Sequence, residues 1–187
     1  IFKGRNTTSN WAVYNDPDGD GTLAISLLND SAVNVTNSSP FTMNDSVFTW
    51  TGASSYSNTN GTQYICYAFR SVKGYSKIGQ YTGSGNADGV FVYTGFKPAF
   101  VLVRNRNAAH NWFLQDSERL GYNPANHLQK PNTNGADDTG NHIDLLSNGF
   151  KVRSSSENNN GSGHAMLYLA FAKEPFVASN NVAATAR

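Results

Sequence analysis

The stretch of sequence that decides the fold is Thr62–Arg104, TQYICYAFRSVKGYSKIGQYTGSGNADGVFVYTGFKPAFVLVR. It combines aromatic and β-branched residues with glycine-rich turns, which predicts three or four strands. Residues 64–69 are apolar or aromatic at both odd and even positions. Because successive side chains of a strand point to opposite faces, we expect this strand to lie inside a sandwich. Residues 100–103 form a second such run, with Pro98 near its start, where a missing N–H is tolerated.

The part of the chain before the middle of this stretch resembles the part that follows it. Their anchor residues occur in one order, with a shift of one residue along the way: Asn10 with Asn111, Trp11 with Trp112, Phe48 with Phe150, and Ala68-Phe69 with Ala170-Phe171. We predict an internal duplication with pseudo-repeats at about 2–77 and 97–178 around one shared core. The alternative is a chance alignment of generic strands.

Short strands at this spacing predict an all-β fold, a jelly-roll-like β-sandwich built from the duplication. At 187 residues, the chain suits a single domain spanning 1–187. The first copy lacks the opening half of its first strand, so we expect the C-terminal part of a longer chain. Asn148-Gly149 predicts a hairpin turn. The segments 29–45 and 117–141 are expected to be long loops, which are often functional.

The composition narrows the class of partner. Hydrophobic residues make up 39% of the chain, enough for a sizeable core, whereas charged residues make up only 14%. Typical domains have about 25% charged residues. A surface rich in Asn, Ser, Thr and Gly suits an extracellular or virion protein and contacts to carbohydrate. The net charge of +1, with no basic stripe, argues against nucleic acid as a partner. No run approaches the ~18 apolar residues of a membrane span.

The chain shows no recognisable catalytic constellation, so we do not expect an enzyme. Its single cysteine, Cys66, lies between two apolar residues and is expected to be a buried, inert thiol. The four histidines lack the spacing of a metal site. The three glutamates form no obvious pair with an aspartate.

A calcium site is predicted at residues 16–21, DPDGDG. Asp16, Asp18 and Asp20 have the D-x-D-x-D-G spacing of calcium loops, in which carboxylates converge around a glycine-enabled turn. Leu27 stands where an EF-hand would have its bidentate glutamate, and no flanking helices are expected. The alternative is an acidic turn without a metal.

A glycan site is predicted in the long loop that follows Trp112. Its candidate residues combine planar and amide groups suited to sugar hydroxyls: Asp116, Arg119, Tyr122, Asn123 and His127. The alternative is that Asp116 and Arg119 form an ion pair that anchors the loop. Trp11, Trp50 and Trp112 are candidate sugar-stacking rings, although the equivalent positions of Trp11 and Trp112 favour core packing for both.

Residues 74–104 resemble a segment that recurs in structural proteins of marine bacteriophages and cyanophages, described as tail-fibre-like or as concanavalin-like lectin-type. Other segments share this resemblance: Trp112, Asp116 and Arg119 in their W-x-x-x-D-x-x-R spacing, Tyr122-Asn-Pro124, Leu146–Phe150, Tyr168–Phe171 and Pro175-Phe176. The resemblance implies a homotrimeric, virion-attached module that is repeated along a longer fibre and contacts other virion proteins. The ligand predicted for the loop site is a host cell-surface glycan. It carries over no catalytic or binding residue, and residues 16–21 depart from its pattern. The alternatives are a spacer module or a glycan depolymerase.

Overall fold

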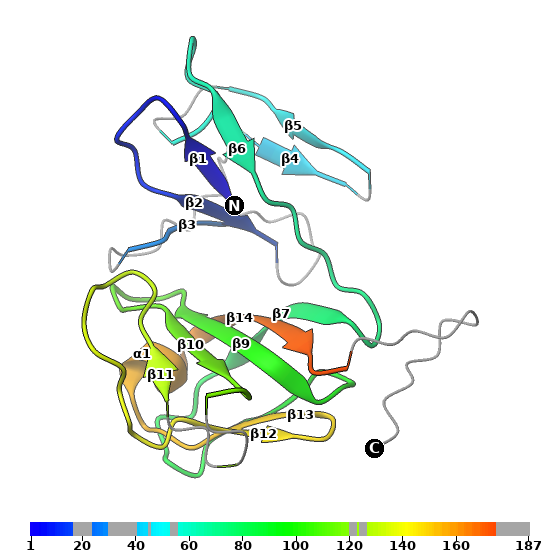
Figure 1. Ribbon diagram of the computed structural model, residues 1–187, viewed down its shortest axis with the longest axis vertical. Helices are drawn as coiled ribbons and strands as arrows, with labels where there is room; N and C mark the ends of the chain where they lie inside the picture. Colours follow the sequence, from blue (N-terminus) through cyan, green and yellow to red (C-terminus); the bar gives the residue numbers. More distant parts are fainter. Residues whose placement is uncertain are drawn as a thin grey trace.

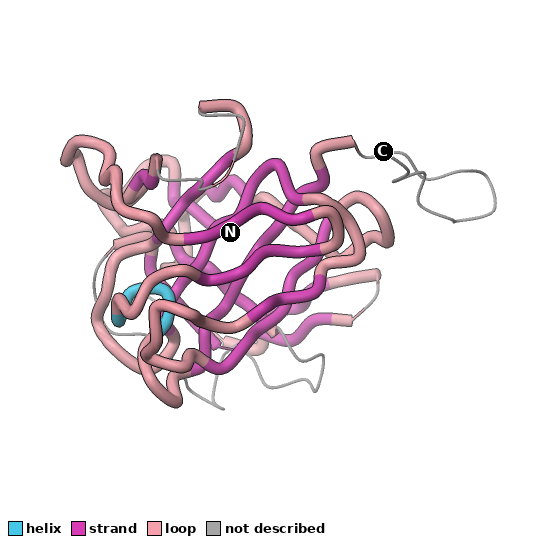
Figure 2. Tube along the Cα trace, turned by 90° about the horizontal axis from the view of Figure 1, so that it is seen from below, coloured by secondary structure: helices cyan, strands magenta, loops and turns pink. Residues whose placement is uncertain are grey.

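The computed structural model describes residues 1–16, 24–29, 41–44, 46–52, 56–119, 123 and 127–174. Its regular structure is nearly all antiparallel strand, arranged in several sheets, which confirms the predicted all-β sandwich class (Figure 1). Figure 2 shows strands through the centre of the molecule and the short helix α1 (Glu157–Asn160) at its margin. Within the described residues, no helix is long and apolar enough to cross a membrane.

The first half of the chain forms a four-stranded sheet and a separate hairpin. Its strands are β1 (Phe2–Gly4), β2 (Ala12–Asn15), β3 (Ala24–Leu27), β4 (Phe41–Met43), β5 (Phe48–Trp50) and β6 (Tyr64–Cys66). The sheet has the order β3-β2-β1-β6, and β4 pairs with β5. A cluster of buried aromatic residues, with Phe2, Tyr14 and Phe41 at its centre, joins the sheet to the hairpin.

The second half of the chain forms a larger two-layered unit. Its strands are β7 (Ser76–Thr82), β8 (Phe91–Tyr93), β9 (Pro98–Asn105), β10 (Phe113–Asp116), β11 (Leu128–Gln129), β12 (Ile143–Leu146), β13 (Gly149–Val152) and β14 (Ala165–Ala172). One sheet has the order β11-β10-β9-β14-β7, and the other has the order β12-β13-β8. The largest buried cluster includes Phe96, Phe150 and Met166, so it takes side chains from both layers.

The two halves meet sheet against sheet (Figure 1). A third cluster, in which Val13, Trp112 and Leu167 are buried, lies between the four-stranded and the five-stranded sheet. The Trp112 indole donates a hydrogen bond to the carbonyl oxygen of Leu27 at 2.9 Å. The fully buried Arg104 guanidinium lies 5.6 Å from the Trp112 ring centroid. Among the described residues, the buried apolar side chains thus group into three clusters, and the third joins the two sheets.

The strand order of the two halves corresponds. The order β3-β2-β1-β6 in the first half has its counterpart in β11-β10-β9-β14, and hairpin β4-β5 has its counterpart in β12-β13. Trp11 and Trp112 each come directly before corresponding strands, but only Trp112 is buried. Trp11 is 37% exposed, so the expectation of core packing is wrong for it. The duplication, and with it the single domain at 1–187, stays a prediction.

The expectation of a buried strand at residues 64–69 is wrong. β6 is the edge strand of the four-stranded sheet, and Ile65, Tyr67 and Phe69 are exposed. Cys66 is likewise exposed, not buried as expected, and partial desolvation raises the pKa of its thiol. An apolar pattern on both faces of a strand does not reveal whether a second layer of protein covers its outer face. The prediction of burial failed for this reason.

Two further boundaries differ from expectation. Residues 41–43 lie in the segment predicted as loop, yet they form β4, because Phe41 packs into the aromatic cluster. The predicted hairpin at 148–149 exists, with its turn one residue earlier, at Ser147-Asn148. Gly149 is instead the first residue of β13, where it is paired with Leu146.

Candidate functional site

The predicted loop site is in part an ion-pair cluster around Asp137. Arg119 Nε lies 2.7 Å from Asp116 Oδ2, and Arg119 Nη1 lies 2.9 Å from Asp137 Oδ2. His127 Nδ1 lies 3.8 Å from that same Asp137 oxygen. The structure thus brings Asp116, Arg119 and His127 together. The Asp116–Arg119 pair of the loop-anchoring alternative is present, and a ligand role for these residues stays a prediction.

Local geometry keeps Asp116 ionised. Partial burial acts to raise the pKa of its carboxyl, but hydrogen bonds from Arg119 and from the backbone N–H of Glu118 outweigh burial, so the pKa is lowered. The backbone N–H groups of Glu118 and Arg119 both donate to Asp116 Oδ1, at 2.9 and 3.1 Å. These contacts close a turn after β10 in which an aspartate caps backbone donors.

The other two predicted loop residues lie elsewhere or outside the described residues. Asn123 acts as an extension of the sheet, because its amide donates to the Leu145 carbonyl at 2.9 Å and accepts from the Leu145 N–H at 2.8 Å. Asn123 therefore lies beside β12, and its hydrogen bonds go to Leu145 and not to Arg119 or Asp137. Tyr122 falls outside the described residues.

The predicted calcium site falls largely outside the described residues. Only Asp16 of its three carboxylates is described, while Asp18 and Asp20 are not. In the part of the chain that is described, no group of three or more His, Cys, Asp or Glu residues could hold a metal ion. Calcium at residues 16–21 stays a prediction.

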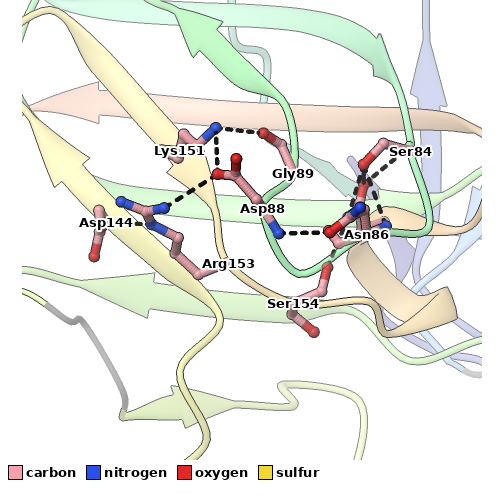
Figure 3. A network of polar contacts seen from close by, with 9 residues as sticks. Ser84, Asn86, Asp88, Gly89, Asp144, Lys151, Arg153 and Ser154 are labelled. Carbon is pink, nitrogen blue, oxygen red and sulfur yellow. Dashed lines mark hydrogen bonds and ion pairs between the residues drawn. The ribbon is translucent and has the colours of Figure 1, made fainter.

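A second polar cluster lies on the outer face of sheet β12-β13-β8, which we term the distal face because it points away from the four-stranded sheet (Figure 1). Lys151 Nζ lies 2.9 Å from Asp88 Oδ1. Arg153 joins two carboxylates, with Nη1 at 3.3 Å from Asp88 Oδ1 and Nε at 2.6 Å from Asp144 Oδ2. Figure 3 shows the four side chains converging from the loop before β8, from β12 and from the end of β13.

The surroundings of Asp88 favour the charged form of its carboxyl. The Lys151 ammonium donates a hydrogen bond to Asp88 and carries the opposite charge, and it lowers the pKa of the Asp88 carboxyl. Asp88 is 76% exposed at its side chain, so its pairs with Lys151 and Arg153 contribute little to stability. These ion pairs instead determine the positions of the charges and of the hydrogen-bonding atoms on the distal face.

A buried amide holds the loop that carries Asp88. The side chain of Asn160, at the end of α1, accepts from the Ser84 N–H at 2.8 Å and donates to the carbonyls of Asn86 and Ser154 at 2.7 Å each. Asn86 Oδ1 in turn accepts from the Asp88 N–H at 2.9 Å. Because Asn160 is fully buried, these bonds form away from competing water and give Asp88 a defined position.

Beside the ion pairs lies a shallow hollow of about 520 Å³, which we term the distal basin. Its lining combines carboxylate, amide and guanidinium groups: Ala87, Asp88, Asn123, Asn141, Asp144 and Arg153. Asn123, one of the predicted ligand-binding residues, thus belongs to this basin. Such groups can orient a hydroxyl-rich ligand, because they offer both donors and acceptors.

Two aromatic rings stand on the same face. Val92 points into the core, and its neighbours Phe91 and Tyr93 point outward, 43% and 64% exposed. Phe91 is opposite Lys151 in the strand pairing, which sets its ring next to the ion pairs. Gly149 is opposite Tyr93, and a Cβ there would lie 2.1 Å from the Val92 carbonyl oxygen. Glycine at 149 is therefore needed for β8 and β13 to approach this closely.

The sequence pattern alone did not indicate four residues of this cluster: Asp88, Asp144, Lys151 and Arg153. These residues come from three distant segments, and only the pairing of β13 with both β12 and β8 brings them together. A signal was available in residues 143–153, where buried apolar positions alternate with charged ones. That alternation predicts a sheet with a polar outer face.

Comparison with known proteins gives a family without an assigned function. A protein-family model described as "Domain of unknown function (DUF7483)" matches residues 1–175. No curated protein and no solved structure matches the chain.

Proposed function

The chain belongs to the DUF7483 family of domains of unknown function, and we propose that it is a non-catalytic module that binds cell-surface glycans through the distal face. The observation that carries this proposal is that the exposed Phe91 and Tyr93 rings share the distal face with the distal basin, where strand pairing sets Lys151 between Phe91 and Asp144. A sugar presents apolar C–H groups on one side and hydroxyls around its rim. An aromatic ring suits the first, and Asp, Asn and Arg side chains suit the second.

The shallow form of the basin favours weak individual binding, and weak sites become effective when several copies act together. The proposed setting is a homotrimeric tail fibre on the outside of a phage virion, in contact with other virion proteins and with a bacterial host. This setting is supported by the resemblance of residues 74–104 to phage structural proteins. The few charged residues, at 14% of the chain, suit an extracellular location.

Two alternatives make different use of the same residues. In a spacer module, the Asp88–Lys151 and Asp116–Arg119 pairs only stabilise loops, and nothing binds. In a depolymerase, Asp88 and Asp144 would be the acid and base, yet both carboxylates are already engaged in ion pairs with Arg153. Incubation with host polysaccharide is expected to release no reducing ends, and steady release would favour the depolymerase.

A glycan array tests the proposal directly. The assembled protein is expected to bind a subset of bacterial surface glycans, and Tyr93→Ala should weaken that binding about tenfold or more, the effect of losing about 1.4 kcal/mol. Tyr75→Ala is the matched control, because Tyr75 is also exposed, at 46%, but precedes β7 and packs against Phe171. Equal losses in both variants, or no binding to any host glycan or host cell, would refute the proposal.

A further inference from the structure

We infer that the distal face selects uncharged glycans of at least two sugar units over acidic ones. This inference rests on the proposed function and adds the class of ligand. The first observation that supports this inference is that the charges on the distal face balance. The side chains of the ion network comprise two cations, Lys151 and Arg153, and two carboxylates, Asp88 and Asp144. Among the described residues that line the distal basin, Arg153 is the one cation, and it already contacts both carboxylates.

An acidic sugar would therefore meet an unfavourable site. Its carboxylate would need a cation without a partner, whereas Arg153 is bound through Nε to Asp144 and through Nη1 to Asp88. Lys151 is bound to Asp88 and also donates to the carbonyl of Gly89 at 2.7 Å. Freeing Arg153 removes the ion-pair partner of Asp144, and freeing Lys151 leaves Asp88 with only the longer contact to Arg153 at 3.3 Å. Like charges brought close together then oppose binding.

The remaining hydrogen-bonding atoms match hydroxyl groups. Asp88 contacts its partners through Oδ1 and Asp144 through Oδ2, which leaves one oxygen of each as an acceptor. The exposed Asn141 amide makes no hydrogen bond within the described part of the chain. A sugar hydroxyl both donates and accepts, so it can donate to a carboxylate while it accepts from the Asn141 amide.

The two rings set the length of the ligand. Phe91 and Tyr93 occupy alternate positions of β8 and so lie on one face of the strand, about 6.7 Å apart along it. Consecutive sugar units can pack on successive rings, while the hydroxyls of the unit next to Phe91 reach the basin. A monosaccharide would use one of these contacts and leave the other empty.

Calorimetric titration separates neutral from acidic ligands. The probes are linear gluco-, manno- and galacto-oligosaccharides, the corresponding monosaccharides, and oligogalacturonates of equal length, each at low and at high NaCl. At least one neutral oligosaccharide is expected to bind, more tightly than its monosaccharide and with less than about a twofold change in affinity between the salt conditions, because no net charge is screened. Oligogalacturonate is expected to bind at least about tenfold more weakly.

Matched variants assign the effect to the distal face. Asp144→Asn should weaken neutral binding about tenfold, whereas Glu118→Gln should leave it unchanged, because Glu118 pairs with Lys173 away from the basin. Salt-sensitive binding of oligogalacturonate that is tighter than neutral binding and is lost in Tyr93→Ala would overturn the inference and leave the proposed function standing. No binding of any oligosaccharide would overturn both.

Discussion

At the scale of single residues, Asn160 determines the shape of the loop that carries Asp88. Its amide forms hydrogen bonds to the backbone at Ser84, Asn86 and Ser154. No aliphatic residue of similar size could replace these bonds. The position of the charges on the distal face thus depends on a side chain that is itself fully buried.

Replacement of Asn160 by alanine should lower the free energy of unfolding by about 2–4 kcal/mol, because buried donors and acceptors left without a partner cost about 1–3 kcal/mol each. Urea unfolding followed by tryptophan fluorescence measures this change. Asn141→Ala is the matched control and should change stability by less than about 0.5 kcal/mol, since that residue is exposed. Similar midpoints for the two variants would contradict the role given to Asn160.

The buried Tyr81 makes the stability of the folded chain depend on pH in the alkaline range. Burial raises the pKa of its phenol well above the usual value, and its O–H donates to the backbone carbonyl of Asn159 at 2.5 Å. Since the folded pKa exceeds the unfolded value of about 10, its contribution to stability is present below pH 10 and is lost as the pH rises further. Tyr168 has a raised pKa by burial as well, so it adds to the same trend.

The slope of stability against pH above about pH 10 should become shallower in Tyr81→Phe, with the Tyr168 contribution remaining. Denaturant unfolding at a series of alkaline pH values measures it. Tyr93→Phe serves as the control, because Tyr93 is 64% exposed and should leave the slope unchanged. An unchanged slope in Tyr81→Phe would show that the phenol is accessible to water.

At the scale of elements, sheet β12-β13-β8 is the support of the candidate site. Gly149 permits its close pairing, because a Cβ at that position would lie 2.1 Å from the Val92 carbonyl oxygen and 3.0 Å from Phe91 Cζ. Both neighbours belong to β8, so any side chain at 149 must push β8 away. The exposed rings would then lose their position relative to Lys151.

Gly149→Ala should lower the melting temperature by several degrees and abolish glycan binding, while Gly135→Ala should change neither. Gly135 is the matched control, because a Cβ there would be at ordinary van der Waals distance, 3.7 Å from Thr133 Oγ1. Thermal unfolding and the glycan array measure the two effects. Wild-type binding by Gly149→Ala would mean that the site does not depend on the pairing of β8 with β13.

The elements were predictable to different degrees. Alternation and turn chemistry are local properties, so the strands at 98–105 and 165–172 and the hairpin near 148 were predictable from sequence. Whether a side chain is buried depends instead on parts of the chain that are distant in sequence. Residues 64–69 have the apolar pattern of an interior strand, yet β6 stands at an edge, where no further strand pairs with it in the described part of the chain.

At the scale of the whole molecule, the site could be predicted only in part. The sequence indicated Asn123, which lines the distal basin, and Arg119, which instead joins Asp116 to Asp137. The rest of the site is formed from segments that are distant along the chain and meet only after β13 pairs with β8 and β12. A contact of that kind depends on topology, which single-sequence patterns do not specify.

The central claim is that a neutral glycan binds the distal face, and chemical-shift mapping by NMR tests it most directly. Addition of a neutral oligosaccharide to the ¹⁵N-labelled chain should shift amide signals of residues 88–93, 141–144 and 149–153, since these lie beside the distal basin and the two rings. Signals of residues 11 and 67, whose rings stack on each other at 6.2 Å in the other half, should stay unchanged. Shifts confined to that half, or around Arg119 and Asp137, would contradict the claim.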